Sequence, residues 1–177
     1  MHRLFLAVIV CFFTSACSHG DVNFKQPLDL KFTAIDGRKV DLAQLRGKVV
    51  LVDFWATWCP PCLTISPHLL DIYKKYHAQG LEIVGISADS DKSALVKYVK
   101  EKGTPWPEYF DDAGDQVLFQ KMGVETFPTL WLLDRKGVVV DPDFRKLWGD
   151  GAGIGDTIPP ANLARVEAAI QKQLQAP

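Results

Sequence analysis

The sequence predicts an α/β protein in which helices cover both faces of a central mixed β-sheet. Three observations support this fold class. Segments with strand patterns alternate with helical segments through the middle of the chain, and a β-hairpin followed by a helix closes it. With 177 residues, of which 47% are hydrophobic, the chain can bury one core. We therefore expect a single folded domain.

The strands are expected where residues alternate or form short apolar runs between turn signals. Asp36-Gly37 is a typical hairpin turn, so it should join the first two strands as an N-terminal β extension. Arg135-Lys136 should join the last two. In chain order, the predicted strands cover residues 28–35, 39–40, 49–54, 81–87, 128–134 and 137–140.

Helices are expected where apolar residues recur on one face, and Gly103 and Gly123 provide the left-handed residue that often ends a helix. Asp41 should cap a short turn that ends near Leu45, and Pro67 should kink the first helix. Segment 141–157 is expected to be an extra loop, either a contact for a substrate or partner or an inert surface insertion. The predicted helices are one after Cys62 with its apolar face at 65, 69, 72, 73 and 76, then 91–102, 115–122, and a last one with apolar positions 163, 166, 170 and 174.

The motif Trp58-Cys59-Pro60-Pro61-Cys62 stands between the apolar run 49–55 and the first helix. Cys59 should therefore cap the helix, where the helix dipole and free N–H groups stabilise a thiolate. The two prolines suit the first helical positions, which need no N–H donor. The N–H of Cys62 is then the nearest donor to the Cys59 sulfur. This pattern predicts a redox-active dithiol.

A pair of cysteines two residues apart is also half of many structural zinc sites. Zinc needs two further ligands, and the candidates downstream are His68 and His77. Nine residues apart, they fall on opposite sides of one helix. There is no second Cys-x-x-Cys pair, so we expect redox chemistry and no metal.

The N-terminus has the pattern of a secretory signal, with Arg3, an apolar core and the small residues Thr14-Ser15-Ala16. Cys17 follows as in a lipoprotein signal, so lipidation at Cys17 is expected, with plain cleavage near Ala16 or an uncleaved anchor as the alternatives. The expected organisation is a signal peptide at 1–17, a polar tether at 18–27 and the folded domain at 28–175. Export would place the domain in an oxidising compartment, where a dithiol needs an electron donor to stay reduced. The net charge of −1 does not favour nucleic-acid binding.

Taken together, the residues resemble the thioredoxin superfamily. The resemblance rests on the run 52–62 with its two cysteines, on Pro67 five residues after the second cysteine, and on Phe127-Pro128-Thr129. It covers roughly residues 28–174, and the export signal makes the exported, membrane-anchored TlpA/ResA-like branch the best match. The Cys-Pro-Pro-Cys motif itself also occurs in tryparedoxins and nucleoredoxins. The resemblance implies a thioredoxin-like fold with no cofactor other than the Cys59–Cys62 disulfide.

The resemblance also implies roles for three residues. Cys59 would be the nucleophile and Cys62 the resolving thiol, and Cys59 is expected to be the more exposed of the two. Asp53, which interrupts an apolar strand, would be a buried carboxylate beneath Cys62. Burial would raise the pKa of Asp53 and make it a usable base near neutral pH. The alternative is that Asp53 belongs to a structural ion pair.

A second part of the site is implied by the loop at Phe127-Pro128. In the family this loop faces the disulfide with a cis-proline, so Pro128 is expected to be cis and the nearby backbone to pair with an extended substrate. Trp58 and Trp55 are each either part of an apolar rim that binds protein substrates or simple packing. We therefore expect Trp58, Phe127 and Pro128 to contact substrate.

The sequence is best interpreted as an exported thiol-disulfide oxidoreductase of the bacterial cell envelope, on the periplasmic side. It would reduce disulfides of envelope proteins, receive electrons from a membrane donor and be held at the membrane by a lipid anchor. ResA-like members and members that act in cytochrome c maturation commonly carry a glutamate where this chain has Ile65. Its absence favours a more general reductant. Three alternatives remain, which are a net disulfide oxidant or isomerase, a thiol reductant of cytochrome c maturation, and a non-catalytic metal carrier.

Overall fold

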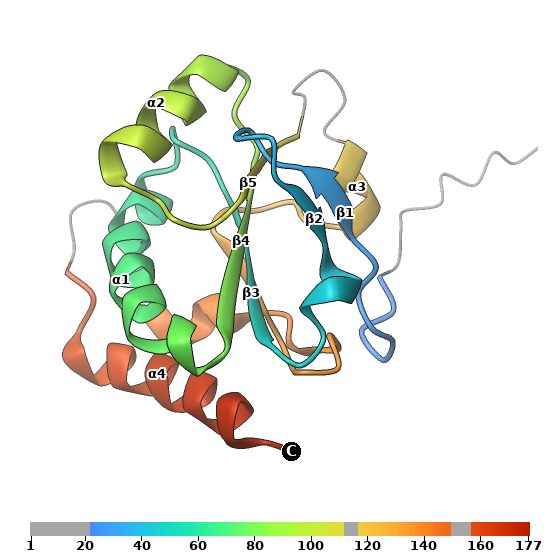
Figure 1. Cartoon of the computed structure of the whole chain (residues 1–177). Coiled ribbons are helices and arrows are strands. Elements are labelled where there is room, and N and C mark those ends of the chain that lie inside the picture. Colours follow the sequence, from blue (N-terminus) through green and yellow to red (C-terminus); the bar gives the residue numbers. More distant parts are fainter. Residues whose placement is uncertain (1–21, 112–116, 150–156) are drawn as a thin grey trace, which may run out of the picture.

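The computed structural model describes residues 22–111, 117–149 and 157–177. A five-stranded sheet with the order β5-β4-β3-β6-β7 forms its centre (Figure 1). β3, β4 and β5 are parallel, and β6 and β7 form an antiparallel hairpin beside β3. The predicted mixed sheet is therefore confirmed. The strands are β3 (Val49–Trp55), β4 (Leu81–Ser87), β5 (Glu108–Phe110), β6 (Thr129–Leu133) and β7 (Val139–Asp141).

Helices and a small hairpin cover the two faces of this sheet (Figure 1). α1 and α4 lie on one face, with α2 on the same side toward β5. The hairpin of β1 and β2 lies on the other face together with α3. The remaining elements are β1 (Lys31–Thr33), β2 (Lys39–Asp41), α1 (Pro60–Tyr76), α2 (Lys92–Lys102), α3 (Val117–Met122), α4 (Pro160–Gln175) and the 3-10 turns η1 (Leu42–Leu45), η2 (His77–Gln79) and η3 (Phe144–Trp148).

β3 is the central strand, and all seven of its residues are buried. Its side chains alternate between two apolar clusters because successive residues of a strand point to opposite faces. Val49 and Leu51 pack with the apolar face of α1, whereas Val52 and Phe54 pack on the opposite side. By this alternation Asp53, the one charged residue of β3, points to the face that α1 covers.

The predicted helix ends are confirmed wherever the structure describes them. Asp41 accepts a hydrogen bond from the Ala43 N–H at the start of η1, and Asp91 accepts one from the Ser93 N–H at the start of α2. Gly103 ends α2 with a φ of 66°. Residues 115–116 of the predicted third helix lie outside the described residues.

One strand was not predicted. β5 has only three residues and follows Pro107, so its pattern is too short to show an alternation. It pairs with β4 in parallel and brings Glu108 into the sheet opposite Gly85. The main-chain oxygen of Glu108 also accepts a hydrogen bond from the Ile35 N–H, which ties the N-terminal hairpin to this edge.

The prediction that segment 141–157 is a loop on the surface is wrong for its first half. Its residues 144–148 form η3, in which Phe144 and Trp148 are completely buried against the α4 side of the core. Two large aromatic side chains within five residues stabilise this turn by burying apolar surface. Residues 150–156 lie outside the described residues.

The end of the expected tether lies against the domain. The ring of Phe24 packs edge-on against Trp131 with centroids 5.2 Å apart, and Pro27 pairs with Val138. Residues 1–21, including Cys17, are outside the described part of the chain. Within the described residues, no helix has both the length and the apolar character needed to cross a bilayer.

Candidate active site

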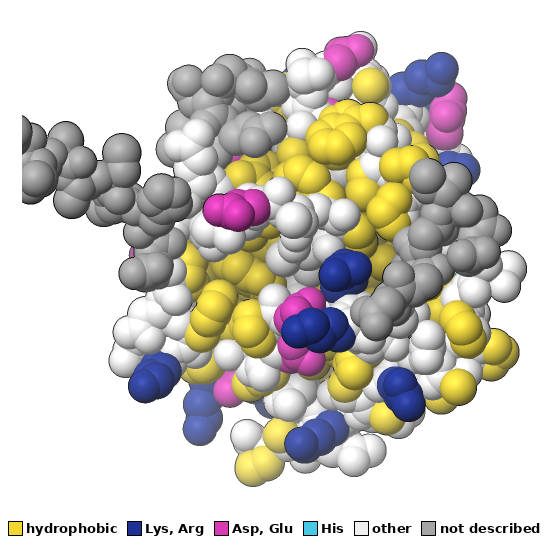
Figure 2. Space-filling model, turned by 180° about the vertical axis from the view of Figure 1, so that it is seen from behind, with side chains coloured by type: hydrophobic (Ala, Val, Ile, Leu, Met, Phe, Trp, Pro, Cys, Tyr) yellow, Lys and Arg dark blue, Asp and Glu magenta, His cyan; other side chains and the backbone are white. Residues whose placement is uncertain are grey.

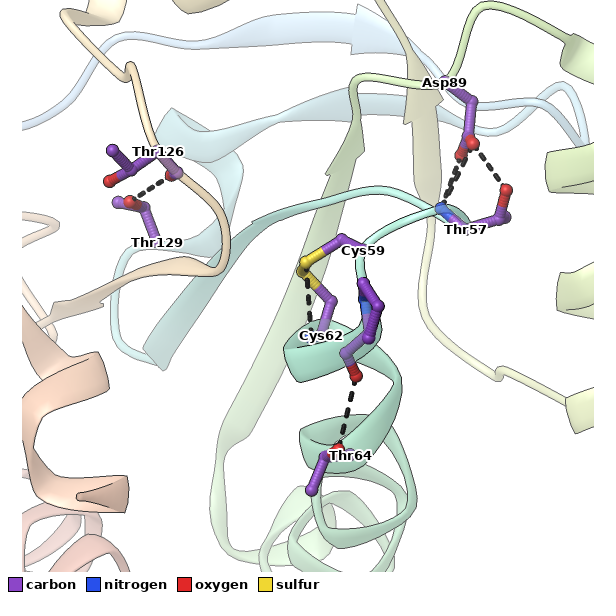
Figure 3. The surroundings of a disulfide bond; sticks show 8 residues. Thr57, Cys59, Cys62, Thr64, Asp89, Thr126 and Thr129 are labelled. Carbon is purple, nitrogen blue, oxygen red and sulfur yellow. Dashed lines mark hydrogen bonds between the residues drawn. A yellow bond between two sulfur atoms is a disulfide. The ribbon is translucent and has the colours of Figure 1, made fainter. Parts of the chain in front are cut away.

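The two cysteines of the motif form a disulfide at the N-terminus of α1 (Figure 3). Their Cα atoms are 5.3 Å apart, and Cys59 is the N-cap residue, as predicted. The Cys62 N–H donates a hydrogen bond to the Cys59 Sγ over 3.3 Å. Pro60 and Pro61 occupy the first helical positions, so neither removes a hydrogen bond that the helix needs. The local geometry thus directs a helix N-terminus at one sulfur atom.

Both cysteines are buried in this disulfide form, and the expected difference in exposure is absent. Cys59 is 3% exposed and Cys62 is 4% exposed. The sulfur of Cys59 points back toward the helix because it is bonded to the sulfur of Cys62. The main-chain N–H of Cys59 donates a hydrogen bond to the Ala56 carbonyl. Exposure therefore does not distinguish the two thiols here, whereas their positions in the helix do.

The segment that leads into the motif is fixed by Asp89, a residue that the sequence did not single out. Asp89 is 1% exposed, and its carboxylate accepts hydrogen bonds from the N–H and the hydroxyl of Thr57 (Figure 3). It also accepts a 2.6 Å hydrogen bond from the Ser87 hydroxyl at the end of β4. Asp89 therefore ties the turn before Cys59 to the neighbouring strand.

The Phe127–Pro128 peptide bond is cis, as the resemblance implies. The loop is closed by the Thr129 hydroxyl, which donates to the Thr126 carbonyl over 2.7 Å (Figure 3). The Phe127 ring contacts Trp58 edge-on, with centroids 5.8 Å apart. Trp58 directly precedes Cys59 in the chain and is 57% exposed, so this aromatic pair includes an exposed side chain next to the motif.

Trp55 is buried, so it does not form part of an apolar rim for protein substrates, which was one of its two expected roles. It is 4% exposed, and its indole N–H donates a 2.9 Å hydrogen bond to the Glu108 carboxyl. Its ring packs against Tyr98 of α2. Trp55 is the last residue of β3, and its side chain is part of the hydrophobic core.

Asp53 is buried on the face of the sheet that α1 covers. It is 8% exposed, and burial raises the pKa of its carboxyl to about 7. No ion pair among the described residues involves Asp53, so the alternative of a structural ion pair has no support there. Burial raises the pKa of Tyr98, which forms a hydrogen bond with Ser66 of α1, and the charge of Asp53 adds to this effect.

A second buried acid, Glu108, lies on the same face of the sheet and was missed. It is 2% exposed, and burial raises its pKa to about 8, with the nearby charge of Asp53 adding to the effect. Two signals in the sequence point to it. Glu108 follows Trp106-Pro107 as a single charge in an aromatic stretch, and Gly85 interrupts an apolar strand, which often marks a close approach.

Within residues 22–111, 117–149 and 157–177, no group of three or more His, Cys, Asp or Glu side chains is arranged to hold an ion. The Cys59–Cys62 disulfide is the redox centre that the site presents. Ile65, where a glutamate stands in some related proteins, is 1% exposed and packs in the apolar core.

A Cys-x-x-Cys disulfide at the start of the helix after the central strand, facing a cis-proline loop, defines a thioredoxin-like protein. The chain matches the Redoxin family over residues 22–143, and it belongs to that family.

The chain is also similar in sequence to named thiol-disulfide oxidoreductases. The chain is 34% identical over 117 residues to the thiol-disulfide oxidoreductase ResA of Bacillus thuringiensis, a match that covers 66% of each protein. It is 33% identical to ResA of Bacillus subtilis over 105 residues, which cover 59% of this chain and 58% of that protein. The matched region thus spans no more than 66% of the length of these relatives.

Solved structures have the same fold. A crystal structure from Chlorobium tepidum, provisionally named thiol:disulfide interchange protein DsbE, matches with a TM-score of 0.66 and 28% identity over 84% of this chain and 95% of that one. A solution structure of a provisionally named thioredoxin from Neisseria meningitidis matches with a TM-score of 0.60 and 27% identity over 69% of this chain and 84% of that one.

Proposed function

We propose that this protein is an exported thiol-disulfide oxidoreductase that reduces disulfides in other proteins of the cell envelope. One observation carries the proposal. The Cys59–Cys62 disulfide lies at the N-terminus of α1, and the face of the sheet that α1 covers carries the buried carboxyl group of Asp53, whose pKa burial raises to about 7. A dithiol that can release its electron pair and a base that can take its proton are the two components that disulfide reduction needs.

In the first step, the thiolate of Cys59 attacks a sulfur atom of the substrate disulfide. The S–S bond of the substrate breaks, one substrate thiolate leaves, and a mixed disulfide joins Cys59 to the substrate. The Cys62 N–H, which donates to the Cys59 Sγ over 3.3 Å, and the positive end of the helix dipole favour the thiolate form of Cys59.

In the second step, Cys62 transfers its thiol proton to Asp53 and attacks Cys59. The mixed disulfide breaks, the second substrate thiolate leaves, and the Cys59–Cys62 disulfide forms. Two electrons have then passed from the dithiol to the substrate. A membrane-bound dithiol donor, by the reverse exchange, would return the enzyme to its reduced form.

Trp58, Phe127 and Pro128 would bind the substrate near its disulfide. The cis-proline loop offers main-chain groups to an extended polypeptide, and the two aromatic rings supply apolar contact area. Figure 2, which views the molecule from behind, shows apolar side chains in its upper part and at several other places on this face.

The sequence at the N-terminus supports the proposed location. Residues 1–17 would direct export, and lipidation of Cys17 would hold the domain at the periplasmic face of a membrane. A membrane-bound electron donor could then reach the disulfide. The buried Ile65 favours a reductant of general substrates over one dedicated to cytochrome c maturation.

Trapping of substrates tests the proposal. The Cys62→Ser variant can complete the first step but not the second, so it should accumulate mixed disulfides with envelope proteins. The Cys59→Ser variant is the matched control and should accumulate almost none. If both variants trap equally, or if Cys59→Ser traps more, the assigned order of the two thiols is wrong.

A further inference from the structure

The register of three neighbouring strands brings a second carboxyl group to Asp53. Asp53 of β3 pairs with Gly85 of β4, and Gly85 pairs with Glu108 of β5. Residues that pair across a sheet point to the same face. A Cβ atom added at Gly85 would lie only 2.0 Å from the Glu108 Oε2, so the Glu108 carboxyl occupies the space directly over the glycine.

This placement makes Glu108 and Asp53 close neighbours. Neighbouring strands are about 4.8 Å apart, so a carboxyl group over Gly85 is about one strand spacing from Asp53. A side chain at residue 85 would have separated the two acids. Gly85 therefore matters here because it has no side chain.

Two tryptophans hold the Glu108 carboxyl in this position. The Trp55 Nε1 donates to Oε2 over 2.9 Å, and the Trp106 Nε1 donates to Oε1 over 2.7 Å. Each carboxyl oxygen thus has one indole donor. These neutral donors favour the ionised form of Glu108 without cancelling its charge.

No described residue forms an ion pair with either acid. Two other titratable groups face Glu108, namely Asp89 and Tyr98 of α2. The charge of Asp89 adds to the raised pKa of Glu108, and the charges of Asp53 and Glu108 add to the raised pKa of Tyr98. Tyr98 forms a hydrogen bond with Ser66 of α1, and because its pKa is raised it is neutral at physiological pH. Two ionised carboxylates at this spacing would repel each other in a buried site.

We propose that Glu108 is a positioning residue for the base Asp53, and that the two carboxyl groups form a coupled pair that holds one proton at neutral pH. This inference rests on the proposed function, in which Asp53 accepts the proton of Cys62. Burial raises the pKa of both groups, to about 7 and about 8, in agreement with a pair that does not ionise fully near neutral pH. In this arrangement a negative charge on either carboxyl group raises the proton affinity of the other.

The competing interpretation is that Glu108 is only a structural acceptor for the two indole N–H groups. A titration of Asp53 separates the two interpretations. We would follow the side-chain carboxyl carbon of Asp53 by NMR in the intact disulfide form, where neither cysteine titrates, and identify its signal with Asp53→Asn. The parent should titrate in two steps, because each proton of a coupled pair leaves separately.

Glu108→Gln removes the neighbouring charge and retains the size of the side chain. Asp53 should then titrate in one step, with a midpoint at least about one pH unit below the upper step of the parent. Glu82→Gln is the matched control, because Glu82 is on β4 but pairs with Lys48, and it should leave the Asp53 curve unchanged. A shift of less than about 0.3 pH unit in Glu108→Gln would overturn the proposal.

Trp106→Phe provides a second variant that keeps the acid. It removes one donor that stabilises the Glu108 anion, so the pair should hold its proton more tightly and the upper step should move to higher pH. A merely structural role predicts a loss of stability in both variants and no shifts of opposite sign. If Trp106→Phe shifts the curve downward or not at all, the coupled pair is also refuted.

This titration needs no substrate, so it can fail or succeed independently of the proposed function. If Asp53 and Glu108 titrate together while Cys62→Ser traps no substrate, the proposed function fails and the pair remains. If trapping succeeds but Asp53 titrates alone, the reductase remains and Glu108 is only an acceptor for the tryptophans.

Discussion

The Cys62 N–H points at the Cys59 Sγ over 3.3 Å, so the second cysteine of the motif provides a hydrogen bond to the first. Because Pro60 and Pro61 have no N–H, this is the first main-chain donor after the cap. The bond would also stabilise a thiolate on Cys59 when the disulfide is reduced, whereas Cys62 is one turn into the helix. The two thiols are thereby made unequal although both are buried.

Alkylation of the reduced protein should reveal this inequality. We expect iodoacetamide to label Cys59 before Cys62 near pH 7, because thiolates react and Cys59 has the larger thiolate fraction. Mass spectrometry of the singly labelled protein measures the ratio. Preferential labelling of Cys62 would reverse the roles that we assign.

Asp53→Asn should slow resolution of the mixed disulfide. The substitution keeps the shape of the side chain and removes the proton acceptor, and a general base typically contributes about 10²–10⁴-fold to a rate. Stopped-flow turnover below pH 8 should show this loss in the second step. The first attack by Cys59 should change much less, and resolution at the parental rate would mean that the proton leaves by another route.

The stability of the protein should fall as pH rises from about 4 to about 8. Burial raises the pKa of Asp53 from 3.8 to about 7 and that of Glu108 from 4.5 to about 8, so the folded state binds more protons than the unfolded state between these values. The free energy of unfolding then decreases with pH, by up to about 1.4 kcal/mol per pH unit for each group.

Urea titrations of the parent at pH 5 and pH 8 measure this slope. Asp53→Asn and Glu108→Gln should each flatten it, and Asp53→Asn should be at least as stable as the parent at pH 8, because a buried charge has been removed. A parent that becomes more stable between pH 5 and pH 8 would contradict the burial of two acids without cationic partners.

Trp58→Ala should weaken the reduction of protein disulfides more than that of a small aromatic disulfide. Trp58 is 57% exposed and contacts Phe127, so its loss removes apolar contact area with a large substrate but leaves the sulfur chemistry intact. We expect kcat/KM for a folded protein substrate to fall about 5- to 30-fold, which corresponds to a loss of about 1–2 kcal/mol. Val96→Ala, at another exposed apolar residue, is the control and should have no effect on either substrate.

The parts of the fold that the sequence predicted well carry their signals locally. β3 is a continuous apolar run, and α2 has both its cap, Asp91, and its terminal Gly103 in the sequence. The cysteine pair and the cis-proline could be located because their motifs are short and contiguous, and the cis bond at Pro128 is confirmed.

The parts that could not be predicted depend on pairing between distant segments. Glu108 acquires its role only because a three-residue strand pairs with Gly85 and so lies beside Asp53. Likewise, nothing local shows that Trp55 points to Glu108 and not to the surface. Trp148 looked like part of a loop because its burial depends on α4, which follows it in the chain.

The equilibrium reduction potential of the Cys59–Cys62 pair, measured against glutathione in the intact protein, tests the central claim most directly. A protein that reduces envelope disulfides should have a potential of about −200 to −280 mV, within the range of glutaredoxins and thioredoxin. A potential near about −120 mV is that of a strong oxidant. That result would mean that the protein introduces disulfides into its substrates, and it would contradict the proposed reductase function.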